Sequence, residues 1–503
     1  MTSPHAESAN RPRDLTSLLR AKAPSVTLVF LLTAYVALFT YMSLRRHYGF
    51  VGWDFDLAIF DQGVWLLSAF KDPYVTVRGL HLFADHSSFI LVLVAPLYWL
   101  WDSPALLLIT QTLALALATI PLYALTRDVL GSRWLGVGLA LALLLHPAVG
   151  WTNLENFHPD SYEVLFLMTA LYFMVKQRWY WFFLFLGLLL LVKEDVPLLT
   201  IPLGVYIAFR FNRRVGIITA VGSLLWLVLT FEVVMPLFHD GGTVYWGRIP
   251  FGGPVAFLKT AVTDPGRVLS YLWTQSRLLY IYQHLSALAF LPLLSPLALA
   301  AVGPLALNLV STHTYMHQIE YHYSTLIVPT LMVAAVLGIE LLGSARNRTL
   351  AVGMLLVTTL GSAAVFGPIQ RVTDPGYLPD MNSPRHAALR EAIDLLPQRA
   401  VVSAHYSIVP HIAHREEVYC WPNPFRAENW ADGTHEGERL PMSEDVEYLL
   451  LIEATKMGEE QLSIYHELRS HFRVIFAEAG VELLERRDAI TETNRSADSS
   501  ESP

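Results

Sequence analysis

The chain has 503 residues, of which 53% are hydrophobic and 16% are charged, far from the composition of a soluble globular protein. Its formal net charge of −8 comes without a block of basic residues, so no nucleic-acid partner is indicated. Cys420 is the only cysteine, which excludes an intramolecular disulfide and a multi-cysteine metal site. Long apolar runs between residues 26 and 366 indicate an integral membrane protein.

The N-terminal segment is polar, contains four basic residues, and precedes a first apolar run at 26–43. No small-residue cleavage site follows this run, so we expect an uncleaved first span and not a signal peptide. Basic flanks stay on the cytoplasmic side of a membrane. The sequence therefore predicts a cytoplasmic tail over 1–25 and a multi-pass protein of the plasma membrane.

The remaining spans are read from apolar runs of roughly 20 residues or slightly fewer. They fall at 104–125, 134–150, 160–175, 179–192, 196–209, 215–236, 285–299, 300–312, 324–342 and 350–367. A further run at 87–101 is expected to lie along the surface or to re-enter, because most Lys and Arg of the turns then face the cytoplasm.

These assignments predict a polytopic α-helical protein with about 11 transmembrane helices and one surface or re-entrant helix. The transmembrane domain covers 26–367, and its first outer loop covers 44–103. An extracytoplasmic α/β domain is expected over 368–487 and a disordered tail over 488–503.

Three consecutive charges, Lys193, Glu194 and Asp195, interrupt the apolar stretch 179–209. A charge at the centre of a membrane helix costs about 2.5–3.5 kcal/mol, so we expect two short helices with the charges at the outer turn. The charges can either reach the membrane interface or line a polar cavity, where intramembrane ionisable groups usually lie.

The expected outer loops contain most of the other unusual polar residues. They include the segments "GWDFDLAIFDQGVW", "GLHLFADHSSF", "WTNLENFHPDSYE" and "STHTYMHQIEYHYS". A carboxylate can deprotonate a hydroxyl, carboxylates and imidazoles can hold a divalent ion, and Arg or Lys can bind a lipid phosphate. We expect one extracytoplasmic cavity surrounded by these groups, with residues 57–70 forming an amphipathic surface helix beside it.

The C-terminal segment alternates strand-like and helix-like patterns. "RAVVSA", "EEVYCW" and "DVEYLLLIEA" predict strands, "GEEQLSIYHELRSHF" a helix, and "RVIFAEAGVELLERR" a hairpin. We expect this small domain to cover the cavity or to contact an acceptor.

Six segments in sequence order carry a resemblance to a known family: "FDLAIFDQGVW", "DHSSFILVLVAPLYWLW", "QTLALALATIPLYALTRDVLG", "NFHPDSYEVLFL", "LLLLVKEDVPLL" and "EYHYSTLIVPTL". Over about 45–370 the chain resembles a bacterial family of predicted membrane proteins of unknown function, which is itself similar to the GT-C glycosyltransferases. The resemblance implies a GT-C-like fold. It also implies sugar transfer from a polyprenyl-phosphate donor to an extracytoplasmic glycan, lipid or protein acceptor, next to membrane lipids.

The resemblance also implies roles for individual residues. Asp56, or Asp54 in its place, matches the catalytic acidic residue of the first loop, and Asp160 or Glu155 matches the second acidic position. Asp160 and Asp54 would hold a divalent ion, Mg²⁺ or Mn²⁺. The residues expected to bind substrate are Asp61, Gln62, His86, Asn156, His158, Lys193, Glu194, Asp195, His322, Arg45 and Arg46.

Two other functions remain open. The protein can be a transporter or flippase of lipid-linked or polar solutes, or a non-catalytic GT-C-like scaffold. Short cytoplasmic turns without inward-facing intramembrane charges argue against transport, because a transporter needs a pathway open to both sides.

Overall fold

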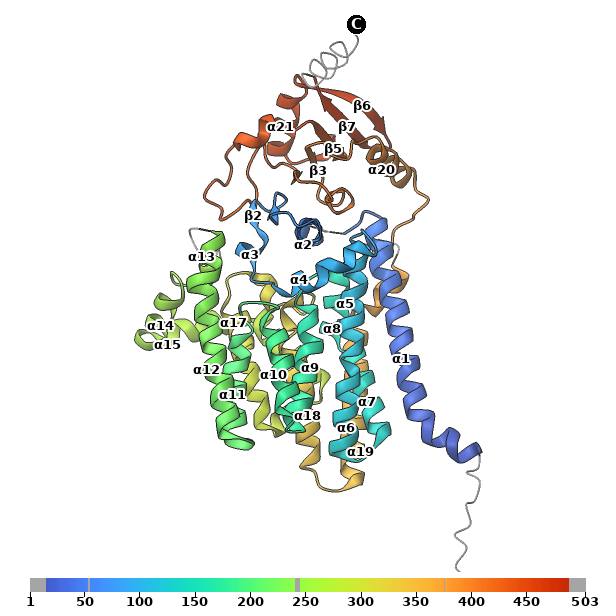
Figure 1. The fold of residues 1–503 in the computed structure, drawn as a ribbon, viewed down its shortest axis with the longest axis vertical. Helices are drawn as coiled ribbons and strands as arrows, with labels where there is room; N and C mark the ends of the chain where they lie inside the picture. Colours follow the sequence, from blue (N-terminus) through green and yellow to red (C-terminus); the bar gives the residue numbers. More distant parts are fainter. Residues whose placement is uncertain (1–14, 53–54, 240–244, 375, 488–503) are drawn as a thin grey trace, which may run out of the picture.

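The computed structural model describes residues 15–52, 55–239, 245–374 and 376–487. A helical bundle carries a small sheet domain at one end (Figure 1). Helix α1 (Leu15–Tyr48) begins at the opposite end of the bundle and runs toward the sheet domain (Figure 1). The N-terminal end of α1 and the sheet domain therefore lie at opposite ends of the bundle.

The helices between the first loop and the sheet domain are of unequal length, and most of them form the bundle. In chain order they are α5 (Ala105–Leu117), α6 (Thr119–Leu130), α7 (Arg133–Leu145), α8 (Pro147–Glu155), α9 (Ser161–Val175), α10 (Trp179–Leu190), α11 (Pro197–Arg210), α12 (Arg213–Leu229), α13 (Met235–Phe238), α14 (Pro254–Thr263), α15 (Pro265–Leu272), α16 (Gln275–Ala287), α17 (Val302–Val310), α18 (Ile327–Glu340) and α19 (Ala345–Phe366).

Within the described residues, five helical segments are long and apolar enough to cross a membrane. They are Lys22–Tyr48, Ala105–Leu130, Arg213–Phe238, His322–Glu340 and Ala345–Phe366. Helices α7 and α8 form a sixth span if the bend of 46° between them is counted as one crossing. Pro147 is the first residue of α8. A backbone N–H at this position has no partner within the helix, so a proline costs no helical hydrogen bond there. Shorter apolar helices, among them α9, α10 and α11, complete the bundle.

The apolar run 285–299 differs from the expected single span. Helix α16 ends at Ala287, and Ala289 and Phe290 then take positive φ angles of 53° and 58°. Two 3₁₀ turns follow, each with a proline in its first turn, because proline starts a helix readily but cannot continue one. The prediction of a span over 285–299 is wrong, and the apolar helical segment in this region is Pro296–Val310.

The first loop packs between the bundle and the sheet domain (Figure 1). It contains α2 (Phe55–Ser68), β1 (Tyr74–Val75), β2 (Leu80–His81), α3 (Leu82–Asp85) and α4 (Ile90–Val94). Helix α2 is buried from Leu57 to Val64, so the expectation of an amphipathic helix on the membrane surface is wrong. The sheet domain covers the polar side of α2: Gln62 Nε2 donates to the carbonyl of Arg415 at 3.2 Å.

The C-terminal domain is a five-stranded sheet in the order β4-β3-β5-β7-β6. Its elements are α20 (Pro384–Asp394), β3 (Val402–Ala404), β4 (Val418–Cys420), β5 (Tyr448–Ile452), α21 (Glu459–Leu468), β6 (Phe472–Glu478) and β7 (Val481–Arg486). Strand β3 pairs in parallel with both β4 and β5, and Val402 lies opposite Val418 and Tyr448. The predicted strands, helix and hairpin are confirmed. Leu449, Leu450 and Leu451 are fully buried, as expected for a strand covered on both faces.

A histidine stack holds the sheet domain against the end of α1. The rings of His47 and His411 lie 4.2 Å apart and are almost parallel, at 7°. The ring of Phe50 lies 4.0 Å from His411 on the same domain boundary. His411 Nε2 donates to the carbonyl of His47 at 3.1 Å, and His386 Nε2 donates to the carbonyl of Tyr48 at 2.8 Å.

We expect this contact to weaken as the pH falls below about 6.5, the ordinary pKa of a histidine. Burial and the neighbouring His47 ring hold the pKa of His411 well below that value. A histidine with a depressed folded-state pKa takes up a proton on unfolding, so its stabilisation is lost as the pH falls from the unfolded-state value. Melting followed by tryptophan fluorescence, at about pH 7.5 and about pH 5.5, measures the effect.

The variant His411→Phe provides the control, because its ring can still pack on Phe50 but cannot be protonated. Its melting temperature should fall less than that of the wild type between the two pH values. His414 has the opposite effect. Burial lowers its pKa, but the Asp61 carboxylate raises it by more, so the pKa of His414 in the folded protein is raised. An equal fall in both proteins would contradict the role given to His411.

Candidate functional site

A cavity of about 890 Å³ lies between the bundle and the sheet domain. Its walls are helix ends and loops of the bundle, α2 of the first loop, and the segments that follow β3 and β4. Of the residues expected at the site, Asp56, His86, Asn156, His158, Asp160, Lys193, His322 and Arg46 line this cavity. These side chains come from chain segments more than 270 residues apart, and the fold brings them together.

Asp56 lies in the first turn of α2, where the positive end of the helix dipole favours a carboxylate. Its side chain is 40% exposed, and its Oδ2 lies 3.6 Å from His158 Nε2. Burial in the cavity raises the pKa of Asp56, but the hydrogen bond and charge of His158 and the other nearby histidines outweigh this and lower it. Asp56 is therefore ionised at neutral pH and can accept a proton.

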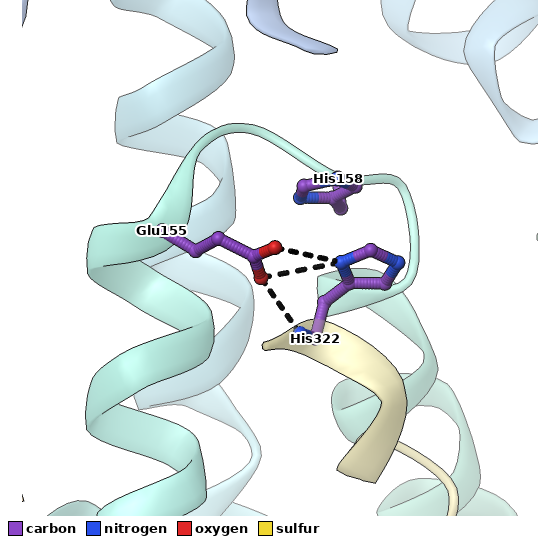
Figure 2. Close-up of side chains that lie close together, drawn as sticks. All are labelled: Glu155, His158 and His322. Carbon is purple, nitrogen blue, oxygen red and sulfur yellow. Dashed lines mark hydrogen bonds and ion pairs between the residues drawn. The ribbon is translucent and has the colours of Figure 1, made fainter. Parts of the chain in front are cut away.

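Glu155, His158 and His322 form a compact group (Figure 2), and His158 is the member next to Asp56. Glu155 ends α8, and its Oε2 accepts the backbone N–H of His322 at 2.7 Å. His322 Nδ1 lies 3.2 Å from the same oxygen. The rings of His158 and His322 are stacked, with centroids 3.6 Å apart (Figure 2). The backbone N–H of His158 donates to Gln111 Oε1 at 3.0 Å, which fixes the loop that carries it.

Lys193 and Asp160 form a buried ion pair of 2.8 Å in the cavity wall. Burial raises the pKa of Asp160, but the Lys193 ammonium and the neighbouring histidines lower it well below its usual range. The pKa of Lys193 is raised in turn, because Asp160 and the adjacent carboxylates outweigh burial. His322 Nε2 lies 4.0 Å from Asp160 Oδ1, so the pair adjoins the histidine group.

The turn between α10 and α11 carries Lys193, Glu194 and Asp195, as expected from their position between two short apolar helices. Glu194 accepts from His86 Nδ1 at 2.8 Å and from the backbone N–H of Ser87 at 3.1 Å. Burial raises the pKa of Glu194, and His86 lowers it below its ordinary value. Asp195 differs from Glu194, because burial raises its pKa to about 6 despite the attraction of Lys193.

Other expected site residues have different surroundings. Asp61 is fully buried and accepts from the Tyr98 hydroxyl at 2.6 Å and from His414. Gln62 contacts the sheet domain, and Arg45 donates to the carbonyl of Pro379 at 2.9 Å. None of these three, nor Glu194 or Asp195, is among the described residues that line the cavity. Asp54 lies outside the described residues.

The structure adds cavity residues that the sequence did not single out as a site. Arg78 lies 3.7 Å from Asp85, and the Tyr245 hydroxyl donates to the same carboxylate. The guanidinium of Arg248 lies 4.1 Å from the ring centroid of Tyr245. Arg78 and Arg248 are visible in the sequence as basic residues, but nothing there indicates that the segments around them meet.

Among the described residues, Glu155, His158 and His322 form a group that could hold a divalent ion. The ligand atoms of these three residues lie within 4.8 Å of one another. His158 Nδ1 is buried and has no hydrogen-bond partner among the described residues. One carboxylate and two imidazoles suit Zn²⁺ or Mn²⁺ more than Mg²⁺, which prefers oxygen ligands. Asp160 is already paired with Lys193. The rings of His158 and His322 are stacked, so one of them must turn before both histidines can bind the same ion.

Several apolar helices long enough to cross a membrane, with a polar cavity at one end of the bundle, are features of a membrane protein. The family model described as "Predicted membrane protein (DUF2079)" matches residues 46–483, and the chain belongs to this family. No curated protein matches the chain. The crystal structure of ArnT from Cupriavidus metallidurans in the apo state is similar, with a TM-score of 0.47 and 13% sequence identity. The match covers 90% of this chain and 98% of that chain.

We expect the purified protein, dialysed against Zn²⁺ or Mn²⁺, to retain about one equivalent of the ion. His158→Ala and His322→Ala each remove one ligand, so each should weaken binding by more than the roughly 10–100-fold lost on removing an outer-shell partner. Mass-spectrometric metal analysis gives the stoichiometry. His313→Ala is the matched control, because His313 lines the cavity outside the group of three. Equal metal content in all four proteins would exclude this site.

Proposed function

We propose that the protein is a GT-C-type integral membrane glycosyltransferase that transfers a sugar from a polyprenyl-phosphate donor to an extracytoplasmic acceptor. The observation that carries this proposal is the exposed carboxylate of Asp56 inside a cavity that also contains Lys193, Arg78 and Arg248. A base and several cations in one enclosed space are what transfer from a phosphate-linked donor requires.

In the proposed reaction, a hydroxyl oxygen of the acceptor attacks the anomeric carbon of the donor sugar. Asp56 takes the proton of that hydroxyl, and the bond between the anomeric carbon and the phosphate oxygen breaks. Its electron pair leaves with the polyprenyl phosphate, which gains negative charge. Arg248, which rests on the ring of Tyr245, is the group that stabilises this charge, because charge-assisted hydrogen bonds to phosphate are strong. Lys193 and Arg78 stay paired with Asp160 and Asp85 in the cavity wall.

The neighbours of Asp56 favour this role. His158 lies within 3.6 Å of the carboxylate and orients it without enclosing it. Asp160 and Glu155 are held by Lys193 and His322, so Asp56 is the more accessible of the three carboxylates. An ion bound by Glu155, His158 and His322 would supply further positive charge next to the donor phosphate.

The cavity residues favour transfer over transport. They lie on the loops and helix ends between the bundle and the sheet domain, at one end of the apolar helices. A transporter of lipid-linked or polar solutes would need a polar path from this cavity through the bundle. A purely scaffolding role would leave the ionised Asp56 in the cavity wall without a chemical task.

We expect Asp56→Asn to lower transfer by about 10²–10⁴-fold, the usual contribution of a general base. Folding should be retained, because Asp56 is partly exposed and its nearest ionic neighbour is 3.6 Å away. The measurement is complementation of a deletion strain, with profiling of envelope glycans and lipid-linked sugars and immunoblotting of the protein.

The matched control is Asp72→Asn, a first-loop carboxylate that is 77% exposed, pairs with His81 and lies outside the cavity. Wild type and this control should restore the missing glycan, whereas Asp56→Asn should accumulate the donor. Full restoration by Asp56→Asn would remove Asp56 from the role of base.

A further inference from the structure

A second cavity, of about 600 Å³, lies where the sheet domain meets the end of α1 and α20. Its floor is formed by the carboxyl ends of two neighbouring parallel strands. Residues 405–407 directly follow β3, and residues 453–458 directly follow β5. Gly458 and Gln461, at the start of α21, complete this side of the cavity.

The strand order places this cavity at a point where ligands commonly bind. The chain leaves β3 to form β4 on one side of β3, and it then crosses over to form β5 on the other side of β3. In open α/β sheets a crevice forms outside the carboxyl ends of the strands at such a reversal, because the two connections leave in opposite directions. The cavity beside His405 and Glu453 occupies this position.

The two cavities adjoin each other along the sheet domain. His405, Tyr406 and Gln461 line both of them. Residues 420–423, which follow β4, line the cavity that contains Asp56. The carboxyl ends of all three parallel strands therefore face these two adjoining cavities, with Asp56 in one and the start of α20 beside the other.

The charges in the second cavity are balanced internally. The carboxylates of its lining are Asp380 and Glu453, the cations are Arg385 and Lys456, and the histidines are His386 and His405. Glu453 pairs with both Arg385 and Lys456, the latter at 3.1 Å. Burial lowers the pKa of His405 to about 4, so its ring is neutral at pH 7.

Such a lining favours an uncharged ligand rich in hydroxyl groups. A phosphate would compete with Glu453 for Arg385 and Lys456, whereas a sugar can hydrogen-bond to the paired groups without breaking them. Ser407 and Gln461 offer further donors and acceptors, and the rings of Phe50 and Tyr406 offer apolar faces. Ligand sites of this size usually combine apolar walls with a few polar groups.

We propose that this second cavity binds the acceptor as a neutral oligosaccharide, whose reacting end passes Tyr406 to reach Asp56. The acceptor assignment rests on the proposed transferase function, but the oligosaccharide site itself does not. Its binding can be measured without any donor.

The test uses full-length protein in detergent on an array of neutral and anionic oligosaccharides. Gly458→Tyr should obstruct the cavity, because Gly458 lines it, has an ordinary φ of −60°, and leaves open space around an added Cβ. The matched control is Glu459→Tyr, one residue further along and outside both linings. Gln461→Ala tests the passage between the two cavities.

We expect wild type and Glu459→Tyr to bind neutral oligosaccharides, Gly458→Tyr to bind at least about 10-fold more weakly, and Gln461→Ala to be intermediate. No donor is present in this assay, so failure of the transfer reaction would leave this result unchanged. Absence of wild-type binding, preference for anionic oligosaccharides, or equal binding by Gly458→Tyr would each overturn the proposal. Melting temperatures of all variants exclude misfolding as the cause.

Discussion

The buried ion pair between Lys193 and Asp160 is the contact on which the geometry of the main cavity depends. Their side chains are 7% and 8% exposed, and the charged atoms lie 2.8 Å apart. Burying either charge costs several kcal/mol in lost hydration. The attraction between Lys193 and Asp160 offsets this cost only while the two residues remain paired. Because the pair joins the α10–α11 turn to the loop before α9, it also fixes His158 and Glu194, which neighbour it in sequence.

The sheet domain is part of the site and is not an independent appendage. Thr76 of the first loop exchanges hydrogen bonds with both backbone groups of Val418, each at 2.9 Å. Gln62 bonds to Thr76 at 2.9 Å, so α2, the first loop and β4 form one connected unit. Asp56 lies at the start of that helix, and residues after β4 face it across the cavity. Any movement of the sheet domain therefore changes the space in front of Asp56.

Local features of the fold could be predicted from the sequence. Apolar length and basic flanks located most of the helical segments, and alternation with β-branched residues located the strands of the C-terminal domain. The charges at 193–195 located the turn between two short helices, because they cannot lie at the centre of an apolar helix. The expected site residues His158, Lys193 and His322 line one cavity, although the sequence separates them by up to 164 positions.

The features that could not be predicted depend on contacts between distant segments. Helix α2 has a polar face suited to a membrane surface, but Asp61 and Gln62 are buried against residues more than 350 positions later in the chain. The break at Ala289 and Phe290 depends on backbone angles that a run of apolar residues does not reveal. The meeting of Arg78, Asp85 and Tyr245 joins two loops 160 residues apart, and no local pattern encodes it.

The two cavities satisfy their charges in different ways, and this difference separates the two proposed substrates. In the second cavity Glu453 lies between Arg385 and Lys456, so neither base is available to an incoming anion without loss of an ion pair. In the main cavity Arg248 rests on the ring of Tyr245, and a cation over an aromatic face can turn to a phosphate at lower cost than one held by a carboxylate. A charged donor would thus be favoured in the main cavity, which contains Asp56, and a neutral acceptor in the cavity that adjoins it.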